Sequence, residues 1–266
     1  MVSDDVARRL DEVRWSTETL LGALRERRPS DAWARQPSLL PGWTRGHVLS
    51  HLARNADAMT RSLSGTLQGE KVPMYDGEEV RAADIEAGAG RPAAELTADV
   101  VESAGRLAET WSRLDDADWQ REAVTREGPV PAVRLIGMRW REVEIHHVDL
   151  DDGYGPGDWP ASFVAPLLPS LLDPRRIGPR LPAGLTVEVV NTDSGQRWLV
   201  GEDVPAAAGT ARTARAAAVR SAAVRSAAAP PVRVVGPSWA LVSWLIGRPA
   251  AVRAELGELP ALRAWS

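Results

Sequence analysis

The stretch "MRWREVEIHHVDL" (residues 138–150) carries two of the four histidines in the chain, next to two glutamates. The other two histidines lie far earlier, in "GWTRGHVLSHLARNA" (residues 42–56). Both stretches are predicted to be helices. Every histidine of the chain therefore lies on one of two predicted helices that are distant in sequence, and we expect the fold to bring these helices together.

The spacing of the histidines and glutamates fits a metal site. Glu142 and His146 are four residues apart, so their side chains leave one face of a helix with Cβ atoms about 5–6 Å apart. His47 and His51 have the same spacing on the earlier helix. Metal sites in helical bundles are built from such residues on facing helices. Two histidines and one glutamate leave a fourth position open, as in catalytic zinc sites.

Spacing alone leaves two alternatives open. A Glu and a His at this separation usually form a solvated pair on a helix surface. Glu144 and His147 form a second, neighbouring pair three residues apart. Periodicity does not decide which of the two pairs faces inward.

The N-terminal half is predicted to be a four-helix bundle. Residues 4–27 place apolar residues at helical spacing, with acids early and arginines late, which matches the helix dipole. Thr44 is the predicted N-cap of the second helix, and Pro131 is predicted to open the fourth. The predicted helices cover residues 4–27, 44–63, 93–114 and 131–151, with a short helical piece at 115–123. Residues 64–92 are predicted to be a long connection, as in bundles with one crossover.

The C-terminal part has a different character. "GYGPGDWP" (153–160) holds three glycines and two prolines and is predicted to be a linker between domains at 1–152 and 161–266. "LTVEVVNT" (185–192) and "QRWLVG" (196–201) predict a β-hairpin. Two further strands are predicted in 230–236 and 251–257, with a helix in 237–247 between them. Residues 206–229, rich in Ala and Arg, are predicted to be an insertion outside the core. We therefore expect a smaller α+β domain.

Composition excludes several classes of function. The net charge is −4, without the concentrated basic face that nucleic-acid binding requires. No stretch approaches the roughly 20 apolar residues of a membrane span, and the N-terminus lacks the apolar core of a signal peptide, so we expect a cytoplasmic protein, either a monomer or a small homo-oligomer. The chain has no cysteine, so any thiol chemistry needs a thiol from outside.

Four stretches together carry a resemblance to a known family. They are "LPGWTRGHVLSHLARNADAM" (40–59), "PMYDGEEV" (73–80), "MRWREVEIHHVDL" and "WLIGR" (244–248). In order and spacing they resemble the mycothiol-dependent maleylpyruvate isomerase family, over most of residues 1–152 and in patches beyond. The resemblance implies a DinB-like four-helix bundle as the N-terminal domain.

The resemblance also implies a set of metal ligands. The family's zinc ligands fall on His51, Glu142 and His146. Glu144 and His147 are then off the ligand face.

Further site residues follow from the same resemblance. His47 becomes a neighbour one turn from the ligands, with a predicted catalytic role either behind the ligands or facing the substrate. Asn55 is predicted to hydrogen-bond a ligand or the bound thiol, with an ordinary buried amide as the alternative. Asp149 is predicted to cap or pair structurally. Arg248 corresponds to an arginine of the family's C-terminal domain that reaches the active site, and its planar fork suits a carboxylate.

The activity that the resemblance implies is thiol-assisted isomerisation. Zinc would hold mycothiol as a thiolate, and the thiolate would add to the cis double bond of maleylpyruvate. Rotation about the resulting single bond and elimination of the thiol would then give fumarylpyruvate. Two alternatives remain, a mycothiol S-transferase that conjugates another electrophile and a non-catalytic metal-binding or small-ligand module. The expected partners are a small electrophile and a low-molecular-weight thiol.

Overall fold

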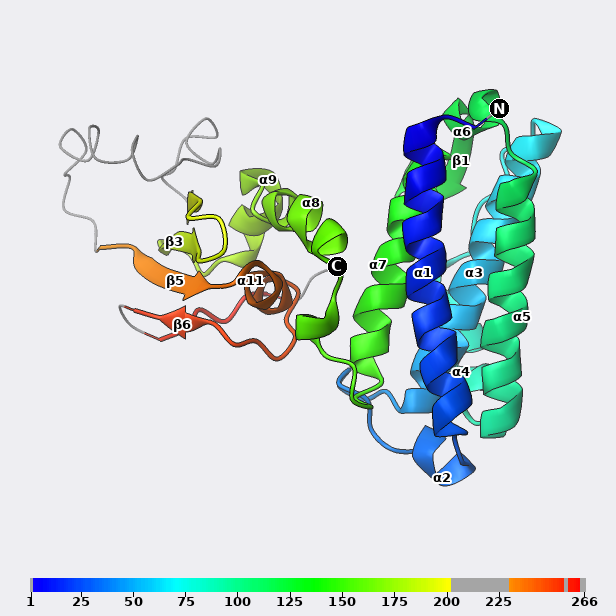
Figure 1. The fold of residues 1–266 in the computed structure, drawn as a ribbon, viewed down its shortest axis with the longest axis horizontal. Coiled ribbons are helices and arrows are strands. Elements are labelled where there is room, and N and C mark those ends of the chain that lie inside the picture. The colour runs from blue at the N-terminus through cyan, green and yellow to red at the C-terminus, as the bar shows by residue number, and fades with distance from the viewer. Residues whose placement is uncertain (1, 202–229, 256–257, 264–266) are drawn as a thin grey trace. The chain divides into compact units, whose positions relative to one another are not determined.

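The computed structural model describes residues 2–201, 230–255 and 258–263, and the chain divides into two compact units, Met1–Tyr154 and Gly155–Ser266 (Figure 1). The boundary between the units falls inside the segment predicted as a linker, where Pro156–Asp158 form the short 3-10 helix η1. The predicted insertion at 206–229 lies outside the described residues. In the part of the chain that is described, no helix has both the length and the apolar character to cross a bilayer.

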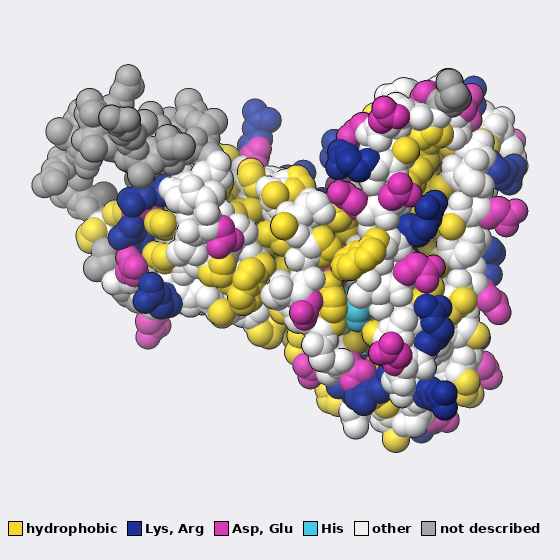
Figure 2. Space-filling model, viewed as in Figure 1, with side chains coloured by type: hydrophobic (Ala, Val, Ile, Leu, Met, Phe, Trp, Pro, Cys, Tyr) yellow, Lys and Arg dark blue, Asp and Glu magenta, His cyan; other side chains and the backbone are white. Residues whose placement is uncertain are grey.

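The first unit is helical, as predicted. Its four long helices are α1 (Asp4–Arg27), α3 (Arg45–Gln68), α5 (Ala93–Ser112) and α7 (Arg134–Asp149). Shorter elements connect them, namely α2 (Asp31–Ala34), α4 (Glu78–Ala89), α6 (Asp116–Gln120), β1 (Glu122–Thr125) and β2 (Gly128–Pro131). Figure 2 shows acidic and basic side chains interspersed over the visible face of this unit, without a patch of one sign.

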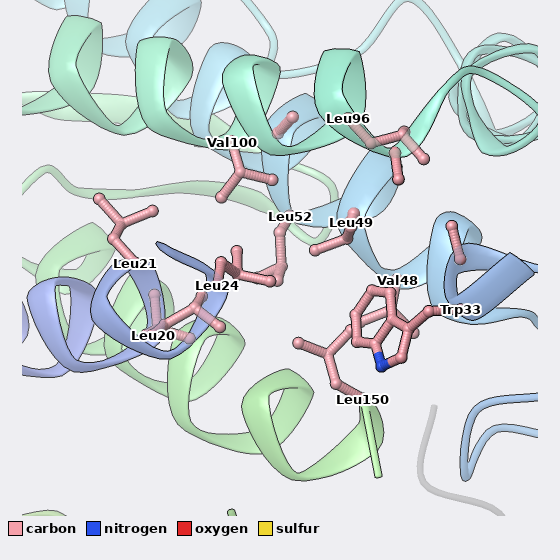
Figure 3. Close-up of a cluster of buried hydrophobic side chains, with 14 residues drawn as sticks. Leu20, Leu21, Leu24, Trp33, Val48, Leu49, Leu52, Leu96, Val100 and Leu150 are labelled. Atoms are coloured by element: carbon pink, nitrogen blue, oxygen red, sulfur yellow. The ribbon is translucent and has the colours of Figure 1, made fainter. Parts of the chain in front are cut away.

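Apolar residues at helical spacing explain why these helices pack together. Leu20 and Leu24 of α1 meet Leu49 and Leu52 of α3 in one buried cluster, to which α5 also contributes (Figure 3). Thr44 caps α3 as predicted, because its hydroxyl accepts the N–H of the third helical residue. The interior of the unit is therefore a continuous apolar core that fixes α3 against its neighbours.

The segment predicted as a connection contains a helix that the sequence pattern did not reveal. Helix α4 buries only Ile85 and Ala89 among its residues, so its periodicity is weak. The helix lies close to α3 because two glycines permit it. A Cβ at Gly46 would meet the Ala89 carbonyl oxygen at 2.4 Å, and one at Gly88 would meet the Ser50 hydroxyl at 2.2 Å. The packing of α4 on α3 therefore depends on close approach at two glycines more than on an apolar stripe along the helix.

The start of the fourth helix was predicted wrongly. Pro131 is the last residue of strand β2, where it pairs with Glu122 of β1, and α7 begins at Arg134. A proline can occupy a two-stranded sheet because each strand has an unpaired edge. The strands have four residues each, which is too short for a clear alternation.

The second unit is a small mixed sheet with helices, as predicted. Its sheet has the order β4-β3-β5-β6, built from β3 (Thr186–Asn191), β4 (Arg197–Gly201), β5 (Val232–Gly236) and β6 (Arg253–Ala254). The predicted β3–β4 hairpin is confirmed, and β5 runs parallel to β3. The helices are α8 (Ala161–Leu171), α9 (Pro174–Ile177), η2 (Gly178–Arg180) and the predicted α11 (Ser238–Leu245).

Helix α8 was not predicted from the sequence. It contains Pro166 and Pro169, which normally break a helix by removing backbone donors. Phe163, Val164 and Leu167 are nevertheless buried along it. Burial of this apolar face offsets the loss of two hydrogen bonds, and only the tertiary structure supplies that burial.

Candidate metal centre

Helices α3 and α7 bring three metal-ligating side chains to one point. The His51 Nε2 atom lies 2.8 Å from Glu142 Oε2 and 3.0 Å from His146 Nε2. The third distance, from His146 Nε2 to Glu142 Oε2, is 3.4 Å. Among the described residues these three form the group of His and acidic side chains suited to hold a metal ion. Two imidazole nitrogens and one carboxylate oxygen match the ligand chemistry of zinc.

The ring of His146 has a fixed orientation. Its Nδ1 lies 2.8 Å from the Oδ2 atom of Asp149, which is fully buried. A carboxylate behind the second ring nitrogen sets the tautomer of a metal-binding histidine. The predicted structural pairing of Asp149 therefore serves the site directly, because it leaves His146 Nε2 as the nitrogen that faces His51 and Glu142.

The three side chains shift one another's pKa values. Burial opposes the charge of Glu142, but hydrogen bonds from His146 and His51 outweigh it and hold the pKa of this carboxyl well below its usual range. Burial likewise opposes the charge of His146, yet hydrogen bonds to Asp149 and Glu142 raise its pKa to about 9. Burial, and then the neighbouring charge of His146, lower the pKa of His51. In the metal-free site the proton therefore resides on His146, beside an ionised glutamate.

His47 lies one turn away and is held by different partners. Its Nδ1 accepts the N–H of Thr44 at 3.1 Å, which completes a capping box at the start of α3. Its Nε2 lies 3.1 Å from Glu86 of α4, and its ring stacks with Trp43 at a centroid distance of 6.0 Å. The structure thus gives His47 a capping position and does not bring it into the group of three ligands.

The neighbouring pair of Glu144 and His147 points elsewhere. Glu144 accepts hydrogen bonds from Ser16 at 2.5 Å and from Tyr154 at 2.7 Å, and burial raises its pKa. His147 stacks on Tyr154 with ring centroids 3.8 Å apart. The tertiary structure therefore separates the two pairs that spacing could not distinguish.

Arg81, Tyr75 and Asn55 lie near the three candidate ligands. The amide oxygen of Asn55 accepts a hydrogen bond of 2.8 Å from the buried Arg139. Arg81 of α4 lies with Nη2 3.4 Å from His51 Nδ1 and stands over the ring of Tyr75. No role was predicted for Arg81 or Tyr75 from the sequence. The stretch "PMYDGEEV" (73–80), which contributes to the family resemblance, contains Tyr75 and ends one residue before Arg81, so that stretch was the signal that could have pointed to them.

The predicted Arg248 belongs to the second unit. It follows α11 and the turn at Gly247, which has a φ of 74°. Its Nη1 donates to the Ile246 carbonyl at 2.9 Å.

Comparison with known structures shows a match over nearly the whole chain. The crystal structure of the mycothiol-dependent maleylpyruvate isomerase superimposes with a TM-score of 0.78 at 26% identity, covering 98% of this chain and 97% of that chain. A histidine-to-alanine mutant of the mycothiol-dependent maleylpyruvate isomerase gives a TM-score of 0.79 at the same identity and coverage. A comparison with curated proteins found no match.

The family comparison covers the helical unit. The sequence model of the mycothiol maleylpyruvate isomerase N-terminal domain matches residues 13–151. This range includes α3 and α7 with all three candidate ligands, and it spans more than half of the chain. The chain therefore belongs to the mycothiol maleylpyruvate isomerase N-terminal domain family.

Proposed function

We propose that this protein is a zinc- and mycothiol-dependent cis–trans isomerase that converts maleylpyruvate, or a related electrophilic cis-enoyl acid, to the trans isomer. The observation that carries the proposal is the convergence of His51, Glu142 and His146 in a chain that matches the mycothiol-dependent maleylpyruvate isomerase over 98% of its length. His51, Glu142 and His146 would hold the metal, and Asp149 would orient His146.

The proposed chemistry needs a thiol from solution, because the chain contains no cysteine. Zinc, when bound, supplies the Lewis acidity that keeps such a thiol ionised near neutral pH. The sulfur adds to one carbon of the cis double bond, and the electron pair moves onto the conjugated carbonyl. The former double bond is then single and rotates. Return of the electron pair expels the thiolate and restores the double bond in trans, so that the thiol is not consumed.

Residues of this chain would bind the substrate carboxylates and the thiol. Maleylpyruvate carries two carboxylates, and a cation beside them would offset their repulsion from a thiolate. Arg248 is the proposed cation, because its fork can bind a carboxylate at two points. His47 and Asn55 are proposed to act at the edge of the metal centre, on the substrate and the thiol respectively, through their positions on α3.

The decisive experiment is turnover of maleylpyruvate by the purified protein with zinc, in the presence and absence of mycothiol. We expect fumarylpyruvate to form only when mycothiol is present, with the thiol recovered unchanged. Protein stripped of metal by a chelator is the matched control and should regain activity when zinc is returned. A stable thiol adduct of an electrophile would instead identify an S-transferase. A protein that binds zinc but catalyses neither reaction would indicate a non-catalytic metal-binding module.

A further inference from the structure

A buried arginine at the start of α3 reaches across to the end of α7. Arg45 donates from Nε to the Leu150 carbonyl at 2.6 Å and from Nη2 to the Asp151 carbonyl at 2.7 Å. Its Nη1 donates to the side chain of Gln36 at 2.5 Å, and its guanidinium lies over the Trp33 ring, 5.0 Å from the centroid. The arginine is thus fixed on several sides, and it ties the first residue of α3 to the two residues that directly follow α7.

A second buried arginine, on α7, makes hydrogen bonds to α3. Arg139 of α7 donates from Nη1 to the Leu52 carbonyl of α3 at 2.9 Å and to Asn55 Oδ1 at 2.8 Å. The side chain is almost completely inaccessible. Burial lowers its pKa to about 10, which still leaves it charged at neutral pH, and Glu142 favours the charge. Burial of a charge is costly, so the fold retains Arg139 despite an energetic penalty.

The two connections lie on opposite sides of the metal ligands. In sequence order, α3 carries Arg45, His51, Leu52 and Asn55. Helix α7 carries Arg139, Glu142 and His146, and Leu150 directly follows it as its C-cap residue. Arg45 of α3 therefore contacts the chain at the end of α7, on one side of the ligand group. Arg139 of α7 contacts α3 on the other side of the ligand group. We name the two connections the arginine clamps, formed by Arg45 with Leu150 and Asp151, and by Arg139 with Leu52 and Asn55.

We propose that Arg45 and Arg139 are positioning residues of the metal centre, which hold α3 and α7 in the register that brings His51 to Glu142 and His146. A functional constellation must be held within about 0.5 Å of its productive geometry. Apolar packing between helices tolerates small sliding motions, whereas hydrogen bonds from a charged guanidinium to backbone oxygens are short and directional. The inference rests on the proposed metal binding.

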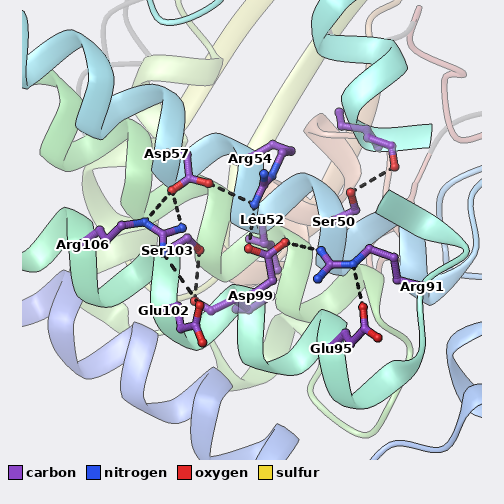
Figure 4. Close-up of polar contacts among 12 residues, drawn as sticks. Ser50, Leu52, Arg54, Asp57, Arg91, Glu95, Asp99, Glu102, Ser103 and Arg106 are labelled. Carbon is purple, nitrogen blue, oxygen red and sulfur yellow. Dashed lines mark hydrogen bonds and ion pairs between the residues drawn. The ribbon is translucent and has the colours of Figure 1, made fainter. Parts of the chain in front are cut away.

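A third arginine provides a matched control. Arg54 also belongs to α3, but it pairs with Asp57 on its own helix at 3.0 Å and with Asp99 of α5 at 2.7 Å (Figure 4). None of the three candidate ligands lies on α5. Replacement of Arg54 should therefore weaken helix packing without changing the register of α3 against α7.

The test compares Arg45→Lys, Arg139→Lys and Arg54→Lys in the full-length protein. Lysine retains the charge but offers one nitrogen in place of the three from which Arg45 donates. Its side chain is also one atom shorter than the path to Nη1, the nitrogen from which Arg139 makes both of its contacts. Zinc affinity would be measured by competition with a chelator, the coordination geometry by the visible spectrum of the Co²⁺-loaded protein, and stability by urea unfolding of the metal-free protein. We expect zinc affinity to fall about 10- to 100-fold in each clamp variant, as for other residues that support metal ligands, with an altered Co²⁺ spectrum. Arg54→Lys should keep wild-type affinity and spectrum.

The outcomes separate this inference from the proposed function. Wild-type protein that binds no zinc would refute the metal centre itself. The positioning role would be overturned if the wild type binds zinc and the clamp variants bind it with the same affinity and the same Co²⁺ spectrum. That result would leave the metal centre intact, whatever the change in stability. Arg45 and Arg139 are tested separately, so a folding defect at the more deeply buried Arg139 leaves Arg45→Lys to decide.

Discussion

The imidazole of His146 is hydrogen-bonded through Nδ1 to the carboxylate of Asp149, three residues further along the same helix, at 2.8 Å. This bond lies within one turn of α7, so the helix itself brings the two side chains within reach of one another. It directs the other ring nitrogen of His146 toward the centre between α3 and α7. The orientation of one candidate metal ligand is therefore favoured by local sequence, while its partners come from the tertiary fold.

The first prediction concerns this bond. Asp149→Asn keeps the size of the side chain but removes the charge behind His146. We expect zinc affinity to fall about 10- to 100-fold, as for other partners of metal-binding histidines, when measured by chelator competition. Asp11→Asn on the exposed face of α1 is the control and should bind zinc as the wild type does. Equal affinity in Asp149→Asn would show that the hydrogen bond does not support the ligand.

The second prediction distinguishes the adjacent histidines. His146→Ala leaves only His51 and Glu142 at the centre, so we expect elemental analysis to find most of the metal lost. His147→Ala removes a ring that stacks on Tyr154 and should leave the metal content close to one ion per chain. Full metal occupancy in His146→Ala would refute the ligand assignment.

The third prediction is a dependence of stability on pH in the metal-free protein. The pKa of His146 is raised to about 9 from 6.5, so its contribution to the free energy of unfolding is complete below pH 6.5 and is lost as pH rises through 9. One pKa unit corresponds to about 1.4 kcal/mol, so a rise of about 2.5 limits the loss to roughly 3–4 kcal/mol. Glu142 has a lowered pKa, and its contribution is lost only as pH falls below its usual range.

Urea unfolding at pH 6, 7.5 and 9, with and without zinc, would measure this dependence. A metal-bound histidine is already neutral, so zinc should remove most of the loss at high pH. Metal-free protein that becomes more stable between pH 6.5 and 9 would contradict the assignment of the proton to His146.

The fourth prediction concerns the second unit. If Arg248 binds a substrate carboxylate, Arg248→Ala should lower kcat/KM about 10- to 1000-fold, which corresponds to about 1.4–4 kcal/mol of transition-state stabilisation. Metal content and thermal stability should stay at wild-type values. Arg248→Lys should recover part of the activity, because it restores the charge without the fork. Unchanged kcat/KM in Arg248→Ala would exclude this role.

The fifth prediction tests the close approach of α4 to α3. Gly46→Ala places a methyl group against the Ala89 carbonyl oxygen, 2.4 Å away, so one helix must move. We expect a loss of about 1–3 kcal/mol in the free energy of unfolding, the usual cost of overpacking. Gly105→Ala, at an exposed position of α5 with nothing within 4 Å, should instead stabilise the protein by up to about 1 kcal/mol. Similar effects at both positions would contradict the packing argument.

The sequence by itself determined the fold class and the main elements. The helices α1, α3 and α5, the N-cap at Thr44 and the β3–β4 hairpin all followed from periodicity and turn chemistry, because these signals are local. The same holds for the four-residue spacing of Glu142 and His146, which a helix converts directly into a shared face. The family also followed from sequence, through the motifs around the histidines.

The tertiary structure decided what local signals cannot encode. Helix α4 packs closely on α3 because Gly46 and Gly88 leave room for the contact, and α8 tolerates two prolines because its apolar face is buried. Spacing alone does not choose Glu142 over Glu144 as the residue facing His51; the family resemblance implied the choice, and its physical basis is how α7 is rotated against α3. That rotation is a property of two segments about ninety residues apart in the chain, and it is determined by packing and buried hydrogen bonds between them, which no local pattern in either segment contains.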